Sequence, residues 1–340
     1  MRTYSMANRT KEKKNIKMII GLLFVGLVFL FACQVCLGTV FISPLEFISL
    51  ISEDATVKRT LLLHVRLPRA LGCLIVGSGL AVAGVIIQNV LSNPLAAPNI
   101  IGVNSAAGCA VAAAMAFMPT AVRYTPLAAF IGAFCGVMLV LFIAEKTGAS
   151  RLTMILAGVA VSSVFSAITD AVVTLIPDAL IGYSAFRIGS LKALSLDRTI
   201  PALAAEIVII AVVLTLSSDM DVLGLGPDTA HSLGLNVRRM RIILLMLASG
   251  LAGISVSLAG IIGFVGLIVP HAMRRLVGTA SRTLLICSAL GGACLLTFCD
   301  LFSRLIFMPY ELPAGIMLSL LGGPFFIFLL IKQRGGRTHE

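Results

Sequence analysis

The chain has 340 residues, of which 59% are hydrophobic and 12% are charged, and its mean hydropathy is +1.05. Roughly a quarter of the residues of a soluble domain are charged, so this composition excludes a water-soluble fold and predicts an all-α integral membrane protein in a lipid bilayer. The net charge of +11 does not indicate nucleic-acid binding, because the basic residues lie between apolar runs and no nucleic-acid motif accompanies them.

Ten apolar runs, most of them about twenty residues long, are predicted to cross the membrane as helices. The first, 18–38, follows a basic segment at 1–17. Such a pair is also typical of a signal peptide, but the hydrophobicity continues past Cys33, which favours an uncleaved span. The other runs are 67–91, 100–118, 126–144, 152–176, 200–216, 242–260, 263–276, 284–306 and 313–331. Because the linkers are short, residues 18–331 are predicted to form one transmembrane domain, followed by a tail at 332–340.

The basic residues predict which way the chain lies in the membrane. Ten spans put both termini on one side, and that side carries 17 of the 26 lysines and arginines, against 9 on the other. Positive residues accumulate on the cytoplasmic side, so the segment at 1–17 and the tail at 332–340 are both predicted to be cytoplasmic.

The two halves of the chain, about 18–180 and 200–331, share a short motif. L-A-V-A-G-V-I in the first half and V-S-L-A-G-I-I in the second are offset by 176 residues, and Pro94 and Pro270 stand ten residues beyond the glycine of each. With five spans in each half, such a duplication predicts two inverted five-helix repeats, an architecture common among transporters.

Three carboxylates, Asp170, Glu206 and Asp300, are predicted to lie at membrane depth. Acids in that position are often functional, and an ion-coupled carrier would need one near the middle of a span. Asp300 precedes Arg304 by one helical turn and could instead pair with it.

Eight cysteines do not indicate a metal or redox centre, because six of them lie inside apolar runs, where cysteine behaves as a small hydrophobe. Cys33 and Cys36 form a C-x-x-C without a second ligand pair, so no metal site is predicted.

Arginines at the outer membrane surface are exceptions to the charge rule. Arg66 and Arg69 lie in R-L-P-R at the mouth of the second span, and Arg304 lies at the outer end of the ninth. Guanidinium groups recognise carboxylates with two hydrogen bonds, so these residues could dock an acidic partner protein. The alternative is that they reach lipid headgroups or pair with Glu311.

The loop 219–241 between the sixth and seventh spans is the longest predicted on the cytoplasmic side. Pro227 can begin a short helix with Asp228 and Thr229 at its positive end, and Gly234 can end it. A short helix here would be a handle for a cytoplasmic partner; the alternative is a simple connecting turn.

The stretch G-F-V-G-L-I-V-P-H places proline and histidine inside an apolar segment. Gly263 and Gly266 would permit close helix approach, and Pro270 would allow a kink. His271 could bind a proton or a metal, but no second ligand shares its face, so a packing role is favoured.

No G-x-x-x-x-G-K-[ST] motif occurs, so the chain is predicted not to hydrolyse ATP, and no catalytic motif stands out. An ion-gradient-coupled secondary transporter is the alternative among membrane functions, supported by the inverted repeat and the intramembrane acids.

Five motifs in order carry a family resemblance. They are R-L-P-R-A-L-G at 66–72, Q-N-V-L-S-N-P-L-A-A-P-N-I-I-G at 88–102, A-H-S-L-G-L at 230–235, G-F-V-G-L-I-V-P-H at 263–271 and E-L-P-A-G-I at 311–316. With these the chain resembles the iron-siderophore, haem and vitamin B12 import permeases of bacterial ABC transporters over nearly its whole length.

The resemblance implies partners and a place in the bacterial cytoplasmic membrane. The implied partners are a second permease copy, two cytoplasmic ATPase subunits that use ATP and Mg, and an extracytoplasmic substrate-binding protein. The resemblance implies no cofactor held by this chain. The resemblance also implies that Arg66, Arg69 and Arg304 dock the binding protein. The coupling helix that meets the ATPase would comprise Asp228, Thr229, Ala230, His231, Ser232, Leu233, Gly234 and Leu235. The inner gate would include Gly148, Ala149 and Ser150, and the fifth and tenth spans would line the central path.

One departure limits what the resemblance says about the cargo. Many relatives carry tryptophan around an outer G-S-L segment, whereas this chain has no tryptophan and Phe186 precedes Gly189, Ser190 and Leu191. Siderophore, haem and cobalamin all remain open, as does the choice between a homodimer and a heterodimer.

Overall fold

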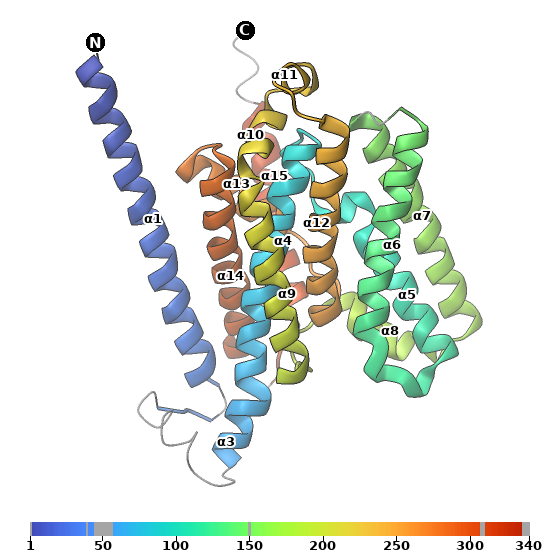
Figure 1. Cartoon of the computed structure of the whole chain (residues 1–340). Helices are drawn as coiled ribbons and strands as arrows, with labels where there is room; N and C mark the ends of the chain where they lie inside the picture. The colour runs from blue at the N-terminus through green and yellow to red at the C-terminus, as the bar shows by residue number, and fades with distance from the viewer. Residues whose placement is uncertain (1, 39, 44–56, 149–150, 307–309, 335–340) are drawn as a thin grey trace.

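The chain forms a bundle of helices, and the computed structural model describes residues 2–38, 40–43, 57–148, 151–306 and 310–334. Regular secondary structure in these residues is entirely helical, as the composition predicts. The long helices stand side by side (Figure 1). The N-terminal end of α1 lies at the same end of the bundle as α11, and α3 lies at the opposite end. We call these the α11 end and the α3 end.

The helices follow one another through the whole described chain. They are α1 (Arg2–Cys36), α3 (Val57–Leu61), the π-helical turn η1 (Leu62–Arg66), α4 (Leu67–Val90), the 3-10 turn η2 (Pro98–Ile101), α5 (Val103–Phe117), the 3-10 turn η3 (Pro119–Tyr124), α6 (Thr125–Lys146), α7 (Arg151–Leu175), α8 (Ala179–Ile188), α9 (Leu196–Thr215), α10 (Ser217–Gly224), α11 (Pro227–Ser232), α12 (Val237–Ala259), α13 (Val265–Val277), α14 (Ser281–Ile306) and α15 (Ala314–Arg334).

Seven stretches of the described chain are long and apolar enough to cross a membrane. They are 15–36, 57–90, 122–146, 151–175, 196–215, 237–259 and 281–306, and each contains or overlaps one of the ten predicted spans. The other three predicted spans coincide with α5, α13 and α15. Of these, α13 has 13 residues and is only about 20 Å long, short of the roughly 30 Å of a bilayer core. Several membrane-length helices are therefore present, and the count of ten crossings stays a prediction.

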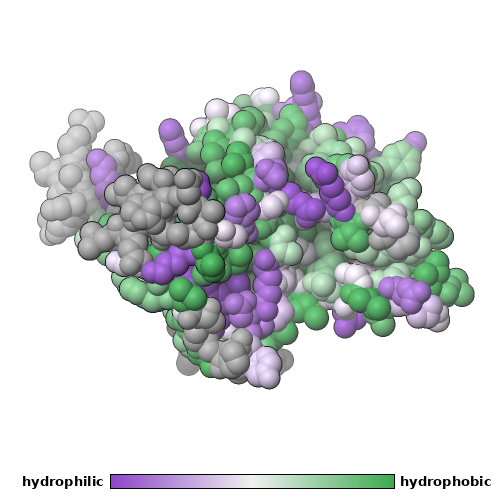
Figure 2. All heavy atoms as spheres, turned by 90° about the horizontal axis from the view of Figure 1, so that it is seen from below, coloured by the Kyte–Doolittle hydropathy of each residue, from purple (hydrophilic) through white to green (hydrophobic). Residues whose placement is uncertain are grey.

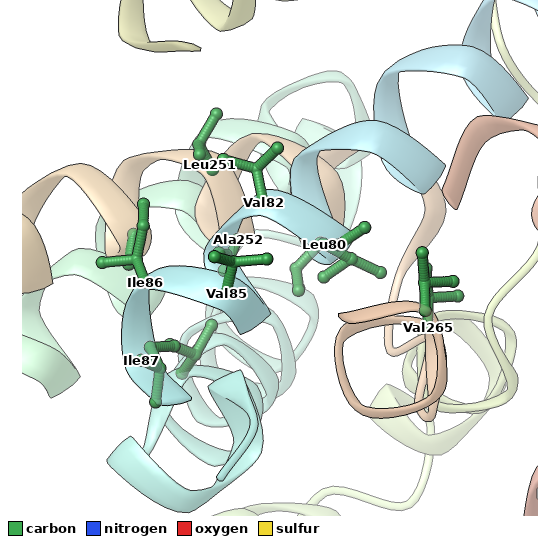
Figure 3. Packing of buried hydrophobic residues seen from close by; sticks show 14 of the residues in the cluster. Leu80, Val82, Val85, Ile86, Ile87, Leu251, Ala252 and Val265 are labelled. Atoms are coloured by element: carbon green, nitrogen blue, oxygen red, sulfur yellow. The ribbon is translucent and has the colours of Figure 1, made fainter. Parts of the chain in front are cut away.

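Helix α4 is the centre of the bundle, because most of its side chains are buried. Leu80, Val85 and Ile86 of α4 pack beside Leu251 of α12 and Val265 of α13 (Figure 3). A core helix in a membrane needs small residues where backbones approach one another, and α4 supplies glycines at those points.

Two glycine contacts bring neighbouring helices against α4. A Cβ added to Gly77 would lie 2.4 Å from the carbonyl oxygen of Gly292 on α14. A Cβ added to Gly84 would lie 2.0 Å from the carbonyl oxygen of Gly266 on α13. Any larger side chain would push the helices apart, so these glycines fix the register of α4 against α13 and α14.

The packing has the partial symmetry that an inverted repeat would produce. If the halves correspond, α4 matches α12, α5 matches α13 and α6 matches α14. The contact of α4 with α14 then corresponds to that of α12 with α6. The contact of α5 with α6 corresponds to that of α13 with α14. Helices α4 and α12 run in opposite directions through the bundle (Figure 1). Helix α1 departs from this pattern, because it packs chiefly on α14, whereas its counterpart α9 packs on α4 and α12.

Segments predicted as connections contain two further helices, α8 and α10. Helix α8 lies between the fifth and sixth predicted spans and packs on α5, and α10 precedes α11. The basic segment predicted at 1–17 also continues the helix of the first span, since α1 begins at Arg2. The cytoplasmic tail predicted at 332–340 falls mostly outside the described residues.

Candidate functional site

The three arginines predicted to dock a partner lie together at the α3 end of the bundle, and all three are buried. Relative exposure is 3% for Arg66, 4% for Arg69 and 6% for Arg304. Hydrophilic residues gather across the middle of this end, with hydrophobic residues around them (Figure 2). The three arginines therefore lie beneath the surface at this end of the bundle.

Arg69 makes the strongest contacts of the three. Its Nε donates to Oδ2 of Asp300 at 2.8 Å and its Nη2 donates to Oδ1 at 3.0 Å, while its Nη1 donates to Oε2 of Glu311 at 2.9 Å. Gln34 of α1 also donates to Asp300. Asp300, which could have paired with Arg304 within α14, therefore pairs with Arg69 and joins α4 to α14. The alternative pairing with Glu311 is present for Arg69.

Arg66 and Arg304 bind backbone carbonyls near the end of α1. The last carbonyls of a helix lack intrahelical donors, and guanidinium groups can satisfy them. Arg66 donates to Val35 O at 2.7 Å, to Cys36 O at 3.0 Å and to Val40 O, and Arg304 donates to Leu37 O. These two arginines therefore cap α1 and hold it against α4 and α14.

Among the described residues, the charges of this cluster do not cancel. Three arginines and Lys192 lie with two carboxylates, Asp300 and Glu311, so two positive charges are in excess there, and Nζ of Lys192 lies 3.4 Å from Oε2 of Glu311. Burial disfavours the ionised form of Glu311, but the hydrogen bond and charge of Arg69, together with Lys192, hold its pKa below the usual value. Glu311 and Lys192 are also the more exposed members, at 34% and 45%.

Helix α11 at the other end has the limits that its sequence predicts. It begins at Pro227 and gives way at Gly234, whose φ of +84° is left-handed. Gly234 N–H donates to His231 O at 2.9 Å and Leu235 N–H donates to Ala230 O at 3.0 Å, which is the Schellman termination. Figure 1 views α11 nearly along its own axis, so it lies across the ends of the long helices. The loop is therefore more than a simple turn.

The surface around α11 is apolar in places and hollowed. Leu225 and Leu233, which flank the helix, are 63% and 62% exposed. A groove of about 530 Å³ between α11 and the start of α12 is lined by residues that include His231 and Arg238. Arg238 Nε also donates to Oε1 of Glu145 at 3.0 Å, which joins the start of α12 to the end of α6.

The predicted packing and kink residues have different surroundings. Gly266 lies against α4, and a Cβ there would be 2.7 Å from Leu80 O. At Gly263 no described atom lies within 4 Å of such a Cβ, so the close approach predicted there is not found. Pro270 lies inside α13, whereas Pro94 lies in the connection after α4 and cannot kink a helix.

His271 and the cysteines form no metal site in the described part of the chain. His271 is half-buried, and its Nε2 has no hydrogen-bond partner among the described residues. No group of three histidine, cysteine or acidic residues occurs there that could hold a metal ion.

The predicted gate lies mostly outside the described residues, which include Gly148 but not Ala149 or Ser150. Gly148 has a left-handed φ of +102° and borders a cavity of about 280 Å³ between α6, α7 and α12.

The three acids predicted to lie at membrane depth have three different environments. Asp300 is paired with Arg69, and Glu206 is 2% exposed with its Oε1 2.7 Å from Ser78 Oγ. Asp170 is exposed on α7 and borders a polar pocket of about 240 Å³. That pocket is lined by Asn104, Ser105, Ser166, Thr169, Asp170, Tyr183 and Ile261.

Sequence reasoning missed a junction where three segments meet. Ile261 N–H donates to Phe186 O at 3.0 Å, Ser190 N–H donates to Ala259 O at 2.7 Å, and Gly315 N–H donates to Gly189 O at 3.2 Å. The G-S-L segment after α8 is thereby tied to the end of α12 and the start of α15. The available sequence signal was the glycine itself, because glycine adopts a left-handed φ without strain and Gly189 has φ +74°.

Comparison with known proteins gives matches along nearly the whole chain. The FecCD transport family matches residues 26–332. The chain is 40% identical over 276 residues to the Fe(3+) dicitrate transport system permease protein FecD of Escherichia coli, covering 80% of this chain and 86% of that protein. It is 35% identical over 335 residues to the Fe(3+)-citrate import system permease protein YfmD of Bacillus subtilis, covering 97% and 99%.

Two further similarities are to a permease whose name gives a different cargo and to a solved structure. The hemin transport system permease protein HmuU of Yersinia pestis is 36% identical over 286 residues, covering 81% of this chain and 84% of that protein. The solved structure of a metal-chelate type ABC transporter in an inward-facing conformation superposes with a TM-score of 0.82 at 28% identity, covering 93% of this chain and 99% of that chain.

Proposed function

The chain belongs to the FecCD transport family, and we propose that it is the permease subunit through which an ABC importer moves an iron chelate, haem or a corrinoid across the cytoplasmic membrane. The observation that carries this proposal is the similarity to iron-citrate and hemin permeases along nearly the whole chain. The absence of a nucleotide-binding motif in the sequence agrees with a subunit that relies on a separate ATPase.

We propose that two permease copies enclose the cargo path and that each crosses the membrane ten times, with cytoplasmic termini. The position of α11 and of the N-terminal end of α1 at one end of the bundle supports this orientation. Helices α7 and α15 would line the path. The polar side chains of Ser166 and Asp170 on α7 support this, because polar groups on a membrane helix need water, cargo or a second copy to contact.

The α11 end would receive the ATPase. We propose that the segment 228–235 fits a cleft of that subunit and passes its movement to the permease. Support comes from the exposure of Leu225 and Leu233, since large apolar side chains on a polar surface are typical of protein contacts. The turn at 148–150 would form part of the inner gate, and alternating access would follow from the ATPase movement.

The α3 end would receive the substrate-binding protein. Because Arg66 and Arg304 bind backbone carbonyls, their proposed contribution is to the shape and positive charge of the docking surface. Arg69 would contribute differently. An acidic residue of the binding protein could take the place of Glu311, which is the more exposed of the two described carboxylates that contact Arg69.

Reconstitution tests this function against ion-coupled transport. The permease would be placed in vesicles with the ATPase and binding protein from neighbouring reading frames, and uptake of an iron-labelled chelate measured. Uptake that needs ATP and both partners is expected. Uptake driven by a proton or sodium gradient without the ATPase would refute the proposal.

A further inference from the structure

A buried acid halfway through the bundle has no counterion among the described residues. Glu206 is the eleventh of the twenty residues of α9, and Ser78, whose Oγ it contacts, is the twelfth of the 24 residues of α4. Both therefore lie near the middle of their helices, where an ionised carboxylate without a counterion is strongly disfavoured.

Charged residues on the helices that pack against α9 are too far away to act as counterions. On α4, Arg69 stands nine residues before Ser78, about 13 Å along the helix. On α12, Arg241 stands 14 residues before Ser255, which lies beside Gly79, or about 21 Å along the helix. Asp219 and Asp221 on α10 lie beyond the end of α9.

The contacts of the Ser78 hydroxyl constrain where the protons can lie. Its Oγ lies 2.5 Å from Leu74 O, in the preceding turn of α4, and 2.7 Å from Oε1 of Glu206. A hydroxyl has one proton, and a carbonyl oxygen can only accept. If Ser78 donates to Leu74, as serine in a helix commonly does, the second short contact requires a proton from Glu206.

The neighbouring residues make room for this arrangement. Gly79 follows Ser78, and a Cβ there would lie 3.1 Å from Oε1 of Glu206 and 2.8 Å from Ser255 Oγ. Ser255 Oγ donates to Leu251 O at 2.8 Å, so its proton is used within α12. The carboxyl group therefore lies in a narrow space between α4 and α12, where a side chain at residue 79 would crowd both Glu206 and Ser255.

We propose that Glu206 is a protonated carboxylic acid that donates its proton to Ser78 and thereby fixes α9 against α4. Helix α9 is followed directly by α10 and α11, so Glu206 acts as a positioning residue for the α10–α11 segment. The proposal concerns the permease alone and does not depend on its cargo or on the ATPase.

Infrared spectroscopy of the full-length permease in lipid nanodiscs at neutral pH tests the protonation. The carbonyl stretch of a protonated carboxylic acid should be present, be absent from Glu206→Gln and shift in frequency in Ser78→Ala. The control is Ser257→Ala, which removes a hydroxyl that donates to Ile254 O within α12 and should leave the band unchanged. If wild type and Glu206→Gln have the same spectrum in this region, Glu206 is ionised and the proposal is wrong.

Stability and hydrogen exchange test the positioning role. Glu206→Ala and Ser78→Ala should each lower the thermal midpoint, and the double variant should lose less than the sum of the two, because they remove the same bond. Amides of residues 217–232 should exchange faster in Glu206→Ala, whereas Glu206→Gln, which keeps a neutral donor, should exchange like the wild type. Fully additive losses, or unchanged exchange in Glu206→Ala, would overturn the role.

Discussion

Arg69 of α4 and Asp300 of α14 form a two-point ion pair in the interior of the bundle, with donor–acceptor distances of 2.8 and 3.0 Å. Exposure is 4% for the arginine side chain and 1% for the aspartate side chain. The pair joins the two halves of the chain where Gln34 of α1 also donates to Asp300. The carboxylate of Asp300 therefore links three helices, α1, α4 and α14.

Asp300→Asn should destabilise the permease strongly. Removing one partner of a buried pair leaves the other charge uncompensated, which costs about 3–5 kcal/mol. We expect a clearly lower thermal midpoint in detergent and less folded protein by size-exclusion chromatography. The control is Glu145→Gln at the exposed pair with Arg238, which should not measurably change the midpoint. Equal midpoints for Asp300→Asn and wild type would contradict the structural importance of the pair.

Glu311 should make stability depend on pH in the acidic range. Its pKa in the folded protein lies below the ordinary value of 4.5, because the favourable effects of Arg69 and Lys192 exceed the cost of burial. A carboxylate with a depressed pKa stabilises fully above its ordinary pKa, and this stabilisation is lost as the pH falls through the folded-state pKa. Glu311→Gln should therefore lower the thermal midpoint at neutral pH, and the difference from wild type should shrink in acid. A constant difference would contradict the ionised pair.

Gly84 should tolerate no side chain. A Cβ would lie 2.0 Å from Gly266 O, so Gly84→Ala must separate α4 from α13, and overpacking of this kind costs about 1–3 kcal/mol. The matched control is Gly263→Ala, because the described residues leave open space around that Cβ. Thermal midpoints should fall for the first variant and stay near wild type for the second. The reverse order would mean that α13 packs differently.

The residues that pack α4 show what the sequence could predict. Hydrophobic runs locate the membrane helices because a bilayer admits few other structures, and the motif glycines and prolines mark where helices end. The partner of Asp300 could not be found in this way. Spacing identifies neighbours on one helix, such as Arg304, whereas the actual partner, Arg69, is 231 residues away and meets Asp300 only because Gly77 and Gly292 let α4 and α14 approach.

Helix α8 shows a second limit of sequence reasoning. Residues 179–188 include polar and glycine residues and lie next to Pro177, so they read as a connection between spans. The segment is helical because it packs on α5, where Tyr183 lies close to Gly108. Whether a short segment is helical depends more on tertiary contacts of this kind than on its intrinsic helix propensity.

The exposed charges at the α3 end should control how fast the binding protein associates. Glu311→Gln raises the net positive charge by one and should speed association with an acidic partner at low salt, whereas Lys192→Glu should slow it. Association rates at low and high salt would measure this, with Lys146→Glu, at the end of α6, as the control. If both variants associate like wild type at low salt, this surface does not dock the binding protein.

Leu233 should be needed for binding the ATPase and not for folding of the permease. Its side chain is 62% exposed at the end of α11, so Leu233→Ala should leave the thermal midpoint unchanged. If the side chain enters the ATPase cleft, its truncation removes apolar burial of about 2 kcal/mol, which weakens binding by at least about tenfold.

The control is Leu175→Ala, an 80% exposed leucine at the opposite end of α7 from the α11 surface. Titration of the ATPase subunit onto the permease in nanodiscs would measure the affinity. Unchanged affinity for Leu233→Ala, or an equal loss for Leu175→Ala, would exclude α11 as the contact, because only a side chain buried by the ATPase loses that burial on truncation.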